Sequence, residues 1–295
     1  MRVFVTGGTG YIGAAVARCL KSRGHHVTIL VRRDEAEIAA RAAGYDVIRG
    51  GLEDASALAK GALEADATVH AATTGDDHRA AADLAAVRAV VGATRGSGKR
   101  FIYTGGCWSY GNTGSKAADE LTSTAGATPL SAWRNAVEDE VAAAAGHNLR
   151  VVIMRPAVVY GDMGGLVGMM AESAKKQGVL RYVGTPTTRW TFIHLVDLAN
   201  LYAQVVERTP EGATILNAAS DQVLPLGEVA LAVARALRVD RVEPWAVDDA
   251  RKTLGAFADA LALDQNVSGK KARQMYKWAA TQPGVIADCA GFARL

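Results

Sequence analysis

Residues 1–33 read MRVFVTGGTGYIGAAVARCLKSRGHHVTILVRR, and this stretch decides the fold. Met1–Thr6 is a short apolar run rich in valine and phenylalanine, which predicts a strand. Glycines follow at once, and apolar residues at helical spacing then predict a helix over Ala14–Arg23. Gly24 ends that helix, and His26–Val31 predicts a second strand. The order strand, glycine turn, helix, strand is that of a βαβ unit with parallel strands.

The glycines of the turn have the spacing Gly7-x-x-Gly10-x-x-Gly13. At a helix N-terminus, free backbone N–H groups and the helix dipole favour an anion such as a pyrophosphate. A Cβ at Gly7 or Gly10 would obstruct the turn or the phosphate, and a Cβ at Gly13 would push the helix away from the strand. Because the motif lies between two predicted strands and opens a helix, it predicts a dinucleotide-binding site rather than an ordinary strand-to-helix turn.

The residues after the second strand bear on which dinucleotide is bound. Val31 is followed by Arg32 and Arg33, so no carboxylate stands there to accept hydrogen bonds from the ribose hydroxyls of NAD. Two guanidinium groups are available to hold a 2′-phosphate through charge-assisted hydrogen bonds. The alternative is that both arginines are solvated surface residues ahead of the next helix. We predict NADP(H) as the cofactor in preference to NAD.

Composition excludes several classes of function. The chain has 295 residues, 49% of them hydrophobic, which is enough for a large core with one domain and a smaller lobe. The net charge of +3 and the absence of a Lys/Arg block argue against a nucleic-acid partner. Cys19, Cys107 and Cys289 are far apart, so they suggest neither a disulfide framework nor a thiolate metal site. No room for a signal peptide precedes the first strand, and no apolar run is long enough for a bilayer. We therefore expect a cytoplasmic protein with no membrane partner and no bound metal.

Strands and helices continue to alternate after the first βαβ unit. Further strands are predicted at Asp46–Arg49, Ala67–Ala72, Arg100–Thr104 and Arg150–Met154. This alternation predicts an α/β fold with a doubly wound parallel sheet. Ligands of such sheets bind at the carboxyl ends of the strands, so the loops that follow the strands are expected to line one crevice.

The segment Val5–Gly13 (VTGGTGYIG) resembles the cofactor loop of the short-chain dehydrogenase/reductase superfamily, in its extended or atypical branch of epimerase/dehydratase-like proteins. Arg155–Gly161 (RPAVVYG) matches that branch's Arg-Pro-x-x-Val-Tyr-Gly, and Arg189–Ala199 resembles its Arg-x-Phe-x-His-Val-x-Asp-x-Ala. Ser268–Pro283 is similar to its C-terminal Ser-x-x-Lys-Ala-x-x-x-Leu-Gly-Trp-x-Pro. The resemblance covers nearly the whole chain. It implies a Rossmann-type doubly wound parallel sheet with a smaller C-terminal α/β substrate lobe.

The resemblance also implies how the chain is divided. Residues 1–160 plus 189–216 are expected to form the dinucleotide-binding domain, and residues 161–188 plus 217–295 the substrate lobe. The cofactor-binding residues are expected in the glycine loop, at the strand ends and in the segment after the sixth strand. Together with the two arginines this set is Gly7, Thr9, Gly10, Tyr11, Ile12, Gly13, Arg32, Arg33, Leu52, Ala71, Ala72, Thr73, Thr104 and Pro156.

The sequence departs from the family where the catalytic residues are expected. The family has a Ser/Thr after the fifth strand and a Tyr-x-x-x-Lys pair on the next helix, with the Tyr as general acid/base. Aligned on Tyr110 and Gly111, the Ser/Thr position falls on Gly106. The Tyr position falls on Ala132 or Trp133, and the Lys position four residues later falls on Ala136 or Val137. The Ser/Tyr/Lys set is therefore missing from this alignment.

Replacement proton donors are sought among phenols on the loops of the predicted crevice. Tyr110 and Tyr160 are our two candidates. For the tryptophans the alternative to a pocket wall is core packing, and for Cys107 the alternative to a nucleophile is a packing thiol. Arg189 is expected to meet either an anionic substrate or a carboxylate of the protein. The candidates for the substrate pocket are Cys107, Trp108, Trp133, Met163, Arg189 and Trp190.

Three functions are compatible with this sequence. The first is an NADP-dependent oxidoreductase that transfers a hydride to or from a small organic substrate without the usual Tyr-Lys pair. The second is an NADP(H)-binding sensor or regulatory protein without turnover. The third is a sugar-nucleotide epimerase or dehydratase, whose chemistry depends most on the missing pair. We expect a small-molecule substrate as the partner and allow for a homodimer.

Overall fold

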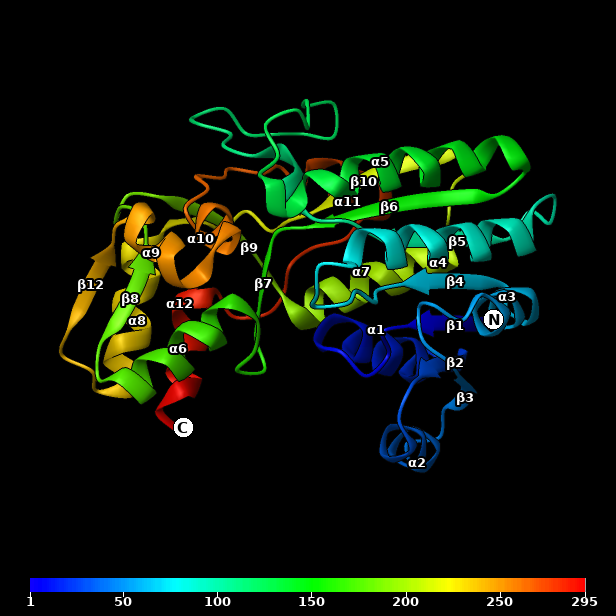
Figure 1. Cartoon of the computed structure of the whole chain (residues 1–295), viewed down its shortest axis with the longest axis horizontal. Coiled ribbons are helices and arrows are strands. Elements are labelled where there is room, and N and C mark those ends of the chain that lie inside the picture. Colours follow the sequence, from blue (N-terminus) through cyan, green and yellow to red (C-terminus); the bar gives the residue numbers. More distant parts are fainter. Residues whose placement is uncertain (295) are drawn as a thin grey trace. The chain divides into compact units, whose positions relative to one another are not determined.

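A seven-stranded parallel sheet is the centre of the first of two units in the computed structural model, which describes residues 1–294 (Figure 1). The strand order is β10-β6-β5-β4-β1-β2-β3. The strands are β1 (Arg2–Thr6), β2 (His26–Val31), β3 (Asp46–Arg49), β4 (Ala67–His70), β5 (Arg100–Thr104), β6 (Arg150–Pro156) and β10 (Ala213–Ala218). The predicted α/β fold with a doubly wound parallel sheet is confirmed.

The register of this sheet brings two loops to one edge. β1 pairs with β2 on one side and with β4 on the other, and Thr6 lies opposite His70 at the ends of β1 and β4. Because parallel strands end at the same edge, the glycine loop after Thr6 and the segment after His70 lie next to each other there. The sheet therefore assembles the edge at which ligands of this fold class bind.

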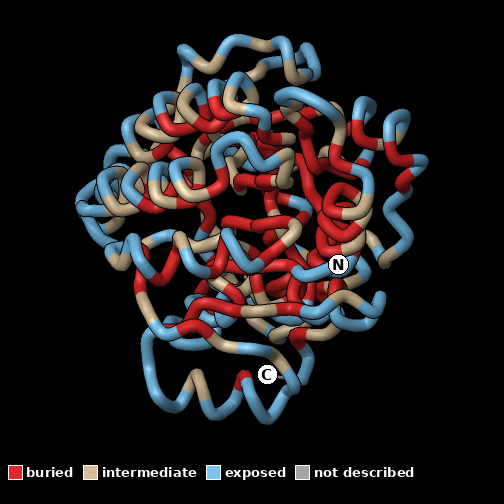
Figure 2. The backbone as a smooth tube through the Cα atoms, turned by 90° about the vertical axis from the view of Figure 1, so that its right-hand side faces the viewer, coloured by how far each residue is buried: buried red, intermediate tan, exposed pale blue. Residues whose placement is uncertain are grey.

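Helices cover both faces of the sheet. Residues of α3, α4 and α5 pack with Phe4 and Phe101 of the strands in one buried cluster. Side chains alternate between faces along a strand, so Val3 and Val5 point to the opposite face, where α1 packs. Buried residues follow the strands, whereas exposed residues follow the outer sides of the helices (Figure 2). The helices of this part of the chain are α1 (Tyr11–Ser22), α2 (Asp34–Ala42), α3 (Ala55–Glu64), α4 (Arg79–Thr94), α5 (Pro129–Ala143), η2 (Ala144–His147) and α7 (Leu195–Glu207).

A buried polar network lies inside this core. His70 is 1% exposed; one ring nitrogen lies 2.9 Å from the Thr6 hydroxyl and the other 3.0 Å from a carboxylate oxygen of Asp83. The Tyr103 hydroxyl donates to the other oxygen of Asp83 at 2.5 Å. Every polar atom in this network has a partner, as buried polar groups require. His70 is therefore a structural histidine of β4.

An ion pair holds α1 to α7 and makes part of the stability depend on pH. Arg23 donates to both oxygens of Glu207 at 2.8 and 2.7 Å, and it lowers the pKa of Glu207 to about 2 from the ordinary 4.5. A depressed carboxyl pKa stabilises the fold above about pH 4.5, and this contribution is lost as the pH falls toward 2. We expect Glu207→Gln to cost about 1–2 kcal/mol near neutral pH and much less near pH 3, measured by urea unfolding.

Glu211 provides the matched control for this prediction. Its carboxylate pairs with Arg150 at 2.6 Å but is 80% exposed, so Glu211→Gln is expected to change stability little at either pH. An equal loss for Glu207→Gln at both pH values would contradict the assignment.

The second unit is built on small sheets. The order β11-β9-β7 describes a three-stranded sheet, and β12 pairs with β8 in parallel. Trp190, Phe192 and Tyr160 of this unit pack with α6 and α8 in its main buried cluster. Its strands are β7 (Val158–Tyr160), β8 (Leu180–Val183), β9 (Arg189–His194), β11 (Val223–Pro225) and β12 (Val242–Trp245). Its helices are η1 (Cys107–Tyr110), α6 (Gly165–Gln177), α8 (Leu226–Leu237), α9 (Val247–Leu254), α10 (Ala256–Leu261), α11 (Lys270–Tyr276), α12 (Val285–Asp288) and η3 (Cys289–Arg294).

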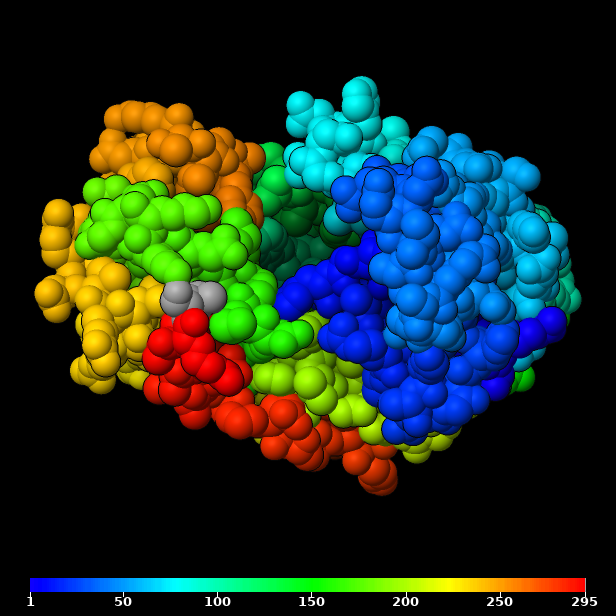
Figure 3. Space-filling model, turned by 90° about the horizontal axis from the view of Figure 1, so that it is seen from below, coloured from blue at the N-terminus to red at the C-terminus, as the bar shows by residue number. Residues whose placement is uncertain are grey.

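The C-terminal segment is fastened within this second unit. α12 and η3 pack against α8, and their red and yellow surfaces adjoin in Figure 3. The carboxylate of Asp197, in the first turn of α7, accepts hydrogen bonds from the backbone N–H groups of Thr281 and Gln282. Asp197 thus holds the C-terminal segment in place. This role could not be predicted from the sequence, because its partners lie more than 80 positions away.

The division of the chain differs from the expected one. The units are residues 1–105, 133–154 and 199–216, and residues 106–132, 155–198 and 217–295. Residues 106–132 join the second unit because the side-chain amide of Gln265 donates to the carbonyls of Cys107 and Gly111 at 2.8 and 2.9 Å. The segments 155–160 and 189–198 join it because β7 and β9 pair there. Among residues 1–294, no helix combines the length and the apolarity needed to cross a bilayer.

Candidate functional site

The glycine loop has a geometry that side chains would disrupt. Gly7 has a φ of +72°, and a Cβ there would lie 2.7 Å from backbone atoms of Ala71 and Ala72. The Gly10 N–H donates to the Gly7 carbonyl at 2.8 Å, and α1 begins at the next residue. A Cβ on Gly13 would lie 2.1 Å from the Gly7 carbonyl oxygen. The loop therefore folds tightly against the start of α1 and the end of β4, as the sequence predicted.

A cleft of about 380 Å³ lies along this loop. Ten of the predicted cofactor-binding residues line it, so the structure brings most of that set together. They are Gly7, Thr9, Gly10, Tyr11, Ile12, Arg32, Leu52, Ala71, Ala72 and Thr73. Leu30, Val31, Gly50, Gly51 and Thr74 complete the wall.

Four predicted residues lie outside the wall of the cleft. Gly13 packs beneath the loop, and Arg33 is an exposed residue at the start of α2. The Thr104 hydroxyl is hydrogen-bonded to the Tyr202 hydroxyl at 2.8 Å. Pro156 ends β6 and is assigned to the second unit. A role in cofactor binding for these residues stays a prediction.

The cations beside the cleft differ in their availability. The Arg49 guanidinium pairs with Asp34 and, at 3.4 Å, with Glu37. Arg32 and Arg33 are exposed, and neither has an ion pair within residues 1–294. Arg32 lines both the cleft and an adjoining open hollow that Arg49 also borders. Arg32 is therefore the guanidinium at the cleft that is able to meet an added anion.

The cleft fits the pyrophosphate of a dinucleotide. The first turn of α1 contains no acidic residue, so no carboxylate competes for its N–H groups. Those N–H groups have no partners within the helix itself, and the helix dipole adds a favourable potential for an anion. The glycines leave the backbone open to close approach of a phosphate.

Comparison with known proteins places this architecture. The model of the NAD dependent epimerase/dehydratase family matches residues 3–219. The chain belongs to this family. An uncharacterized protein of Saccharomyces cerevisiae is 32% identical over 98% of this chain and 97% of its own length. A 2-alkyl-3-oxoalkanoate reductase of Stenotrophomonas maltophilia is 30% identical over 82% of this chain and 78% of its own.

A solved structure shows the same fold over the full length. The human epimerase family protein SDR39U1, determined with NADPH, has a TM-score of 0.80 and 23% identity, and the match covers 100% of this chain and 99% of that one. The extended short-chain dehydrogenase/reductase resemblance is thus confirmed, and members of this epimerase/dehydratase family use a nicotinamide cofactor.

The two tyrosines proposed as proton donors are buried in this family member. The Tyr110 hydroxyl donates to Asn217 at 2.7 Å and accepts from Arg155 at 2.9 Å. The Tyr160 hydroxyl donates to the Pro283 carbonyl at 2.8 Å. Burial raises the pKa of Tyr110, and it raises the pKa of Tyr160 to about 12. Both hydroxyls hold the second unit together, so their role as proton donors stays a prediction that the geometry does not favour.

Arg189 and Cys107, two predicted pocket residues, make structural contacts. Arg189 donates to both oxygens of Asp264 at 3.0 and 2.6 Å and lowers the pKa of that carboxyl. Of its two expected partners, a substrate anion or a carboxylate of the protein, the structure supplies the carboxylate. The Cys107 thiol is 3% exposed and donates to the Arg155 carbonyl at 3.1 Å, as a packing thiol does.

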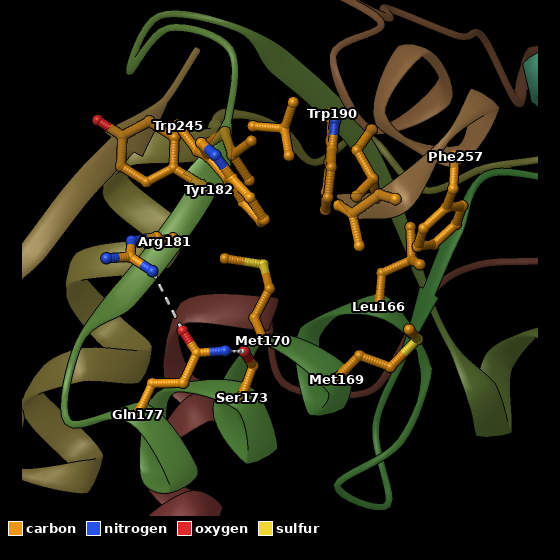
Figure 4. A pocket seen from close by; sticks show the side chains of 14 residues that line it. Leu166, Met169, Met170, Ser173, Gln177, Arg181, Tyr182, Trp190, Trp245 and Phe257 are labelled. Carbon is orange, nitrogen blue, oxygen red and sulfur yellow. Dashed lines mark hydrogen bonds between the residues drawn. The ribbon is translucent and has the colours of Figure 1, made fainter. Parts of the chain in front are cut away.

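The other predicted pocket residues are divided among different places. Trp190 lines an apolar pocket of the second unit (Figure 4), and Trp108 stacks edge-on against Phe257 of the same pocket. Met163 is 44% exposed and does not line that pocket. Trp133 belongs to the first unit, where the Arg134 guanidinium lies 4.4 Å from its ring centre.

Two residues that the sequence alignment passed over lie at the carboxyl end of β5. Arg134 donates to the Tyr103 hydroxyl and the Thr104 carbonyl, both at 3.3 Å. Glu138, one helical turn further along α5, is 3% exposed, and a Cβ on Gly105 would lie 2.2 Å from its carboxylate oxygen. Arg134-x-x-x-Glu138 has the same spacing as the family's Tyr-x-x-x-Lys. Both residues stand on α5, the helix on which the sequence analysis sought that pair.

Proposed function

We propose that this chain is an NADP-dependent oxidoreductase that transfers a hydride to or from a small carbonyl or alcohol substrate. The observation that carries the proposal is Arg32, an exposed guanidinium without an ion pair at the edge of the glycine-loop cleft. The NADPH in human SDR39U1 supports the phosphorylated cofactor. The reductase named in Stenotrophomonas maltophilia supports carbonyl reduction, and it makes oxoacids and ketones the first substrates to screen.

Each part of the cleft has a distinct role in this proposal. The glycine loop and the first turn of α1 would hold the pyrophosphate, and Leu52 would pack on the adenine. Arg32, with Arg33 beside it, would hold the 2′-phosphate through charge-assisted hydrogen bonds. The bound nicotinamide supplies or accepts the hydride.

We further propose that Arg134 stabilises the charge that develops on the substrate oxygen. Its guanidinium has five N–H donors, and only Nη1 is used in the hydrogen bonds to the Tyr103 hydroxyl and the Thr104 carbonyl, which are both 3.3 Å long. Guanidinium stays protonated, so it polarises a carbonyl without giving up its proton. Water would then supply the proton that the tyrosine supplies in family members that have the Tyr-x-x-x-Lys pair. Glu138 follows four residues later on α5 and is buried.

The cofactor assignment predicts a selective loss of affinity when Arg32 is replaced. We expect Arg32→Ala to weaken NADPH binding about tenfold to a hundredfold, because one charge-assisted hydrogen bond contributes about 1.5–3 kcal/mol. NADH affinity should not change, because NADH has no 2′-phosphate. Fluorescence titration of the purified protein with each dinucleotide measures both constants.

Arg33→Ala is the matched control, since Arg33 is as exposed but does not line the cleft. A smaller effect on NADPH is expected there. If wild-type protein binds both dinucleotides equally well, Arg32 does not hold a 2′-phosphate and the NADP assignment fails.

A sensor without turnover is the second candidate, and the buried, fully hydrogen-bonded hydroxyls of Tyr110 and Tyr160 favour it. The two functions give different results in one assay. NADPH consumption with any ketone or oxoacid supports the enzyme. Tight NADPH binding without consumption across a broad carbonyl panel supports the sensor.

A further inference from the structure

The second unit contains a pocket of about 180 Å³ that the proposed hydride chemistry does not use (Figure 4). The lining includes Leu166 and Met170 of α6, Trp190 of β9 and Phe257 of α10, and Met170 and Trp190 face each other across the cavity in this view. Trp245 of β12 lies toward one end. All of these elements belong to one unit, and the residues that line the pocket lie within 166–190 and 226–261.

Three polar side chains at one end of the pocket satisfy one another, whereas the buried indole N–H of Trp190 has no hydrogen-bond partner within residues 1–294. Arg181 donates to the Gln177 side-chain carbonyl at 3.3 Å, and its Nε lies 3.6 Å from the Glu243 carboxylate. Gln177 in turn donates to the Ser173 hydroxyl at 3.2 Å. Figure 4 shows these groups gathered at one end, away from Trp190 and Phe257. Arg181, the cation of the lining, is already paired, so the pocket offers no free guanidinium for a diphosphate.

The apolar wall has the properties of a site for a flexible chain. Met169 and Met170 are adjacent on α6, and methionine side chains repack around ligands of varying shape. The aromatic rings of Trp190 and Phe257 supply broad apolar faces. A sugar nucleotide would leave its hydroxyls and phosphates without partners against such a wall, which costs binding energy.

We propose that this pocket binds an unbranched aliphatic chain of the substrate. The assignment rests on the proposed oxidoreductase function, which it sharpens to carbonyl compounds that carry an alkyl or acyl chain. Burial of each further methylene in an apolar site strengthens binding about fourfold. Affinity should therefore rise regularly with chain length until the pocket is filled, and then level off.

The test is a homologous series from 2-butanone to 2-dodecanone, bound to the NADPH-loaded protein and followed by isothermal titration calorimetry. We expect the dissociation constant to fall about fourfold per methylene over the first part of the series. A uridine diphosphate sugar is titrated in parallel and should neither bind the pocket nor displace the ketone. A dissociation constant that is independent of chain length, or a sugar nucleotide that displaces the ketone, overturns the proposal.

Variants locate the effect in this pocket. Leu166→Trp places a bulky ring in the cavity and should weaken binding of the longest ketones at least tenfold while 2-butanone is unaffected. Leu254→Trp places a ring in the pocket from another lining position, and it is used instead of Leu166→Trp if that variant does not fold. Leu231→Trp, on an exposed position of α8 outside the pocket, is the control and should change nothing.

The two proposals fail in different ways in this experiment. NADPH consumption is recorded with the same ketones in a separate assay. Length-dependent binding without consumption overturns the oxidoreductase function and supports the pocket assignment. Consumption that is insensitive to chain length overturns the pocket assignment and supports the oxidoreductase function.

Discussion

The Gly13→Ala variant is expected to lose cofactor binding and much of its stability. The added Cβ would lie 2.1 Å from the carbonyl oxygen and 2.6 Å from the carbonyl carbon of Gly7, and both are backbone atoms that cannot swing aside. Either α1 moves away from β1 or the loop deforms, at a cost of about 3 kcal/mol. Losing two phosphate contacts from a displaced loop costs about a hundredfold or more in NADPH affinity. Thermal unfolding and NADPH titration measure the two effects.

Gly92 gives a matched control for this glycine. It lies inside α4, and a Cβ there meets no atom within 4 Å. Gly92→Ala should therefore raise stability by about 0.5–1 kcal/mol through helix propensity and leave NADPH affinity unchanged. Wild-type affinity in Gly13→Ala would show that the loop does not hold the pyrophosphate.

Replacement of Arg134 by alanine is expected to lower kcat about 10²–10³-fold with little change in NADPH affinity. The guanidinium lies at the carboxyl end of β5, where it donates to the Thr104 carbonyl at 3.3 Å. Its loss removes a fixed positive charge beside the developing alkoxide, whereas the glycine loop is untouched. Steady-state kinetics with the best ketone from the substrate screen measures the change.

Two further variants separate this role from the alternatives. Arg134→Lys keeps the charge and should recover part of the rate, although it cannot reproduce the planar fork of donors. Tyr160→Phe removes a hydroxyl bonded to the Pro283 carbonyl and should affect stability more than kcat. If instead Tyr160→Phe or Tyr110→Phe loses the rate and Arg134→Ala keeps it, a tyrosine is the proton donor and Arg134 is structural.

The dinucleotide-binding half could be predicted from the sequence because its signals are local. Strand, turn and helix succeed each other within residues 1–33, and each glycine acts on a neighbour a few positions away. The same holds for the cleft, since parallel strands deliver the loops that follow them to one edge. In this half of the chain, the strands, turn and helix predicted from the local sequence are the ones that form the cleft.

The contacts of the second unit could not be predicted, because its side chains form hydrogen bonds with residues far away in the sequence. The sequence left open whether Arg189 meets a substrate anion or a carboxylate of the protein, because its partner Asp264 lies 75 positions later. The hydroxyl of Tyr110 is engaged by Asn217, 107 positions away. Arg134 and Glu138 were passed over for a different reason, because the sequence analysis sought a tyrosine and a lysine on α5 and neither residue type is present there.

The interleaving of the two units has a consequence for synthesis on the ribosome. The chain passes from one unit to the other five times, so neither unit is a continuous segment. The parallel sheet lacks β6 until residue 156 has emerged, and β5 is a temporary sheet edge until then. It lacks β10 until residue 218 has emerged, and β6 is the temporary edge in that interval. Pairings across such long separations form slowly. The nascent chain therefore spends most of its elongation with an incomplete sheet, which makes it a natural client for chaperones and makes excision of either unit by simple truncation futile.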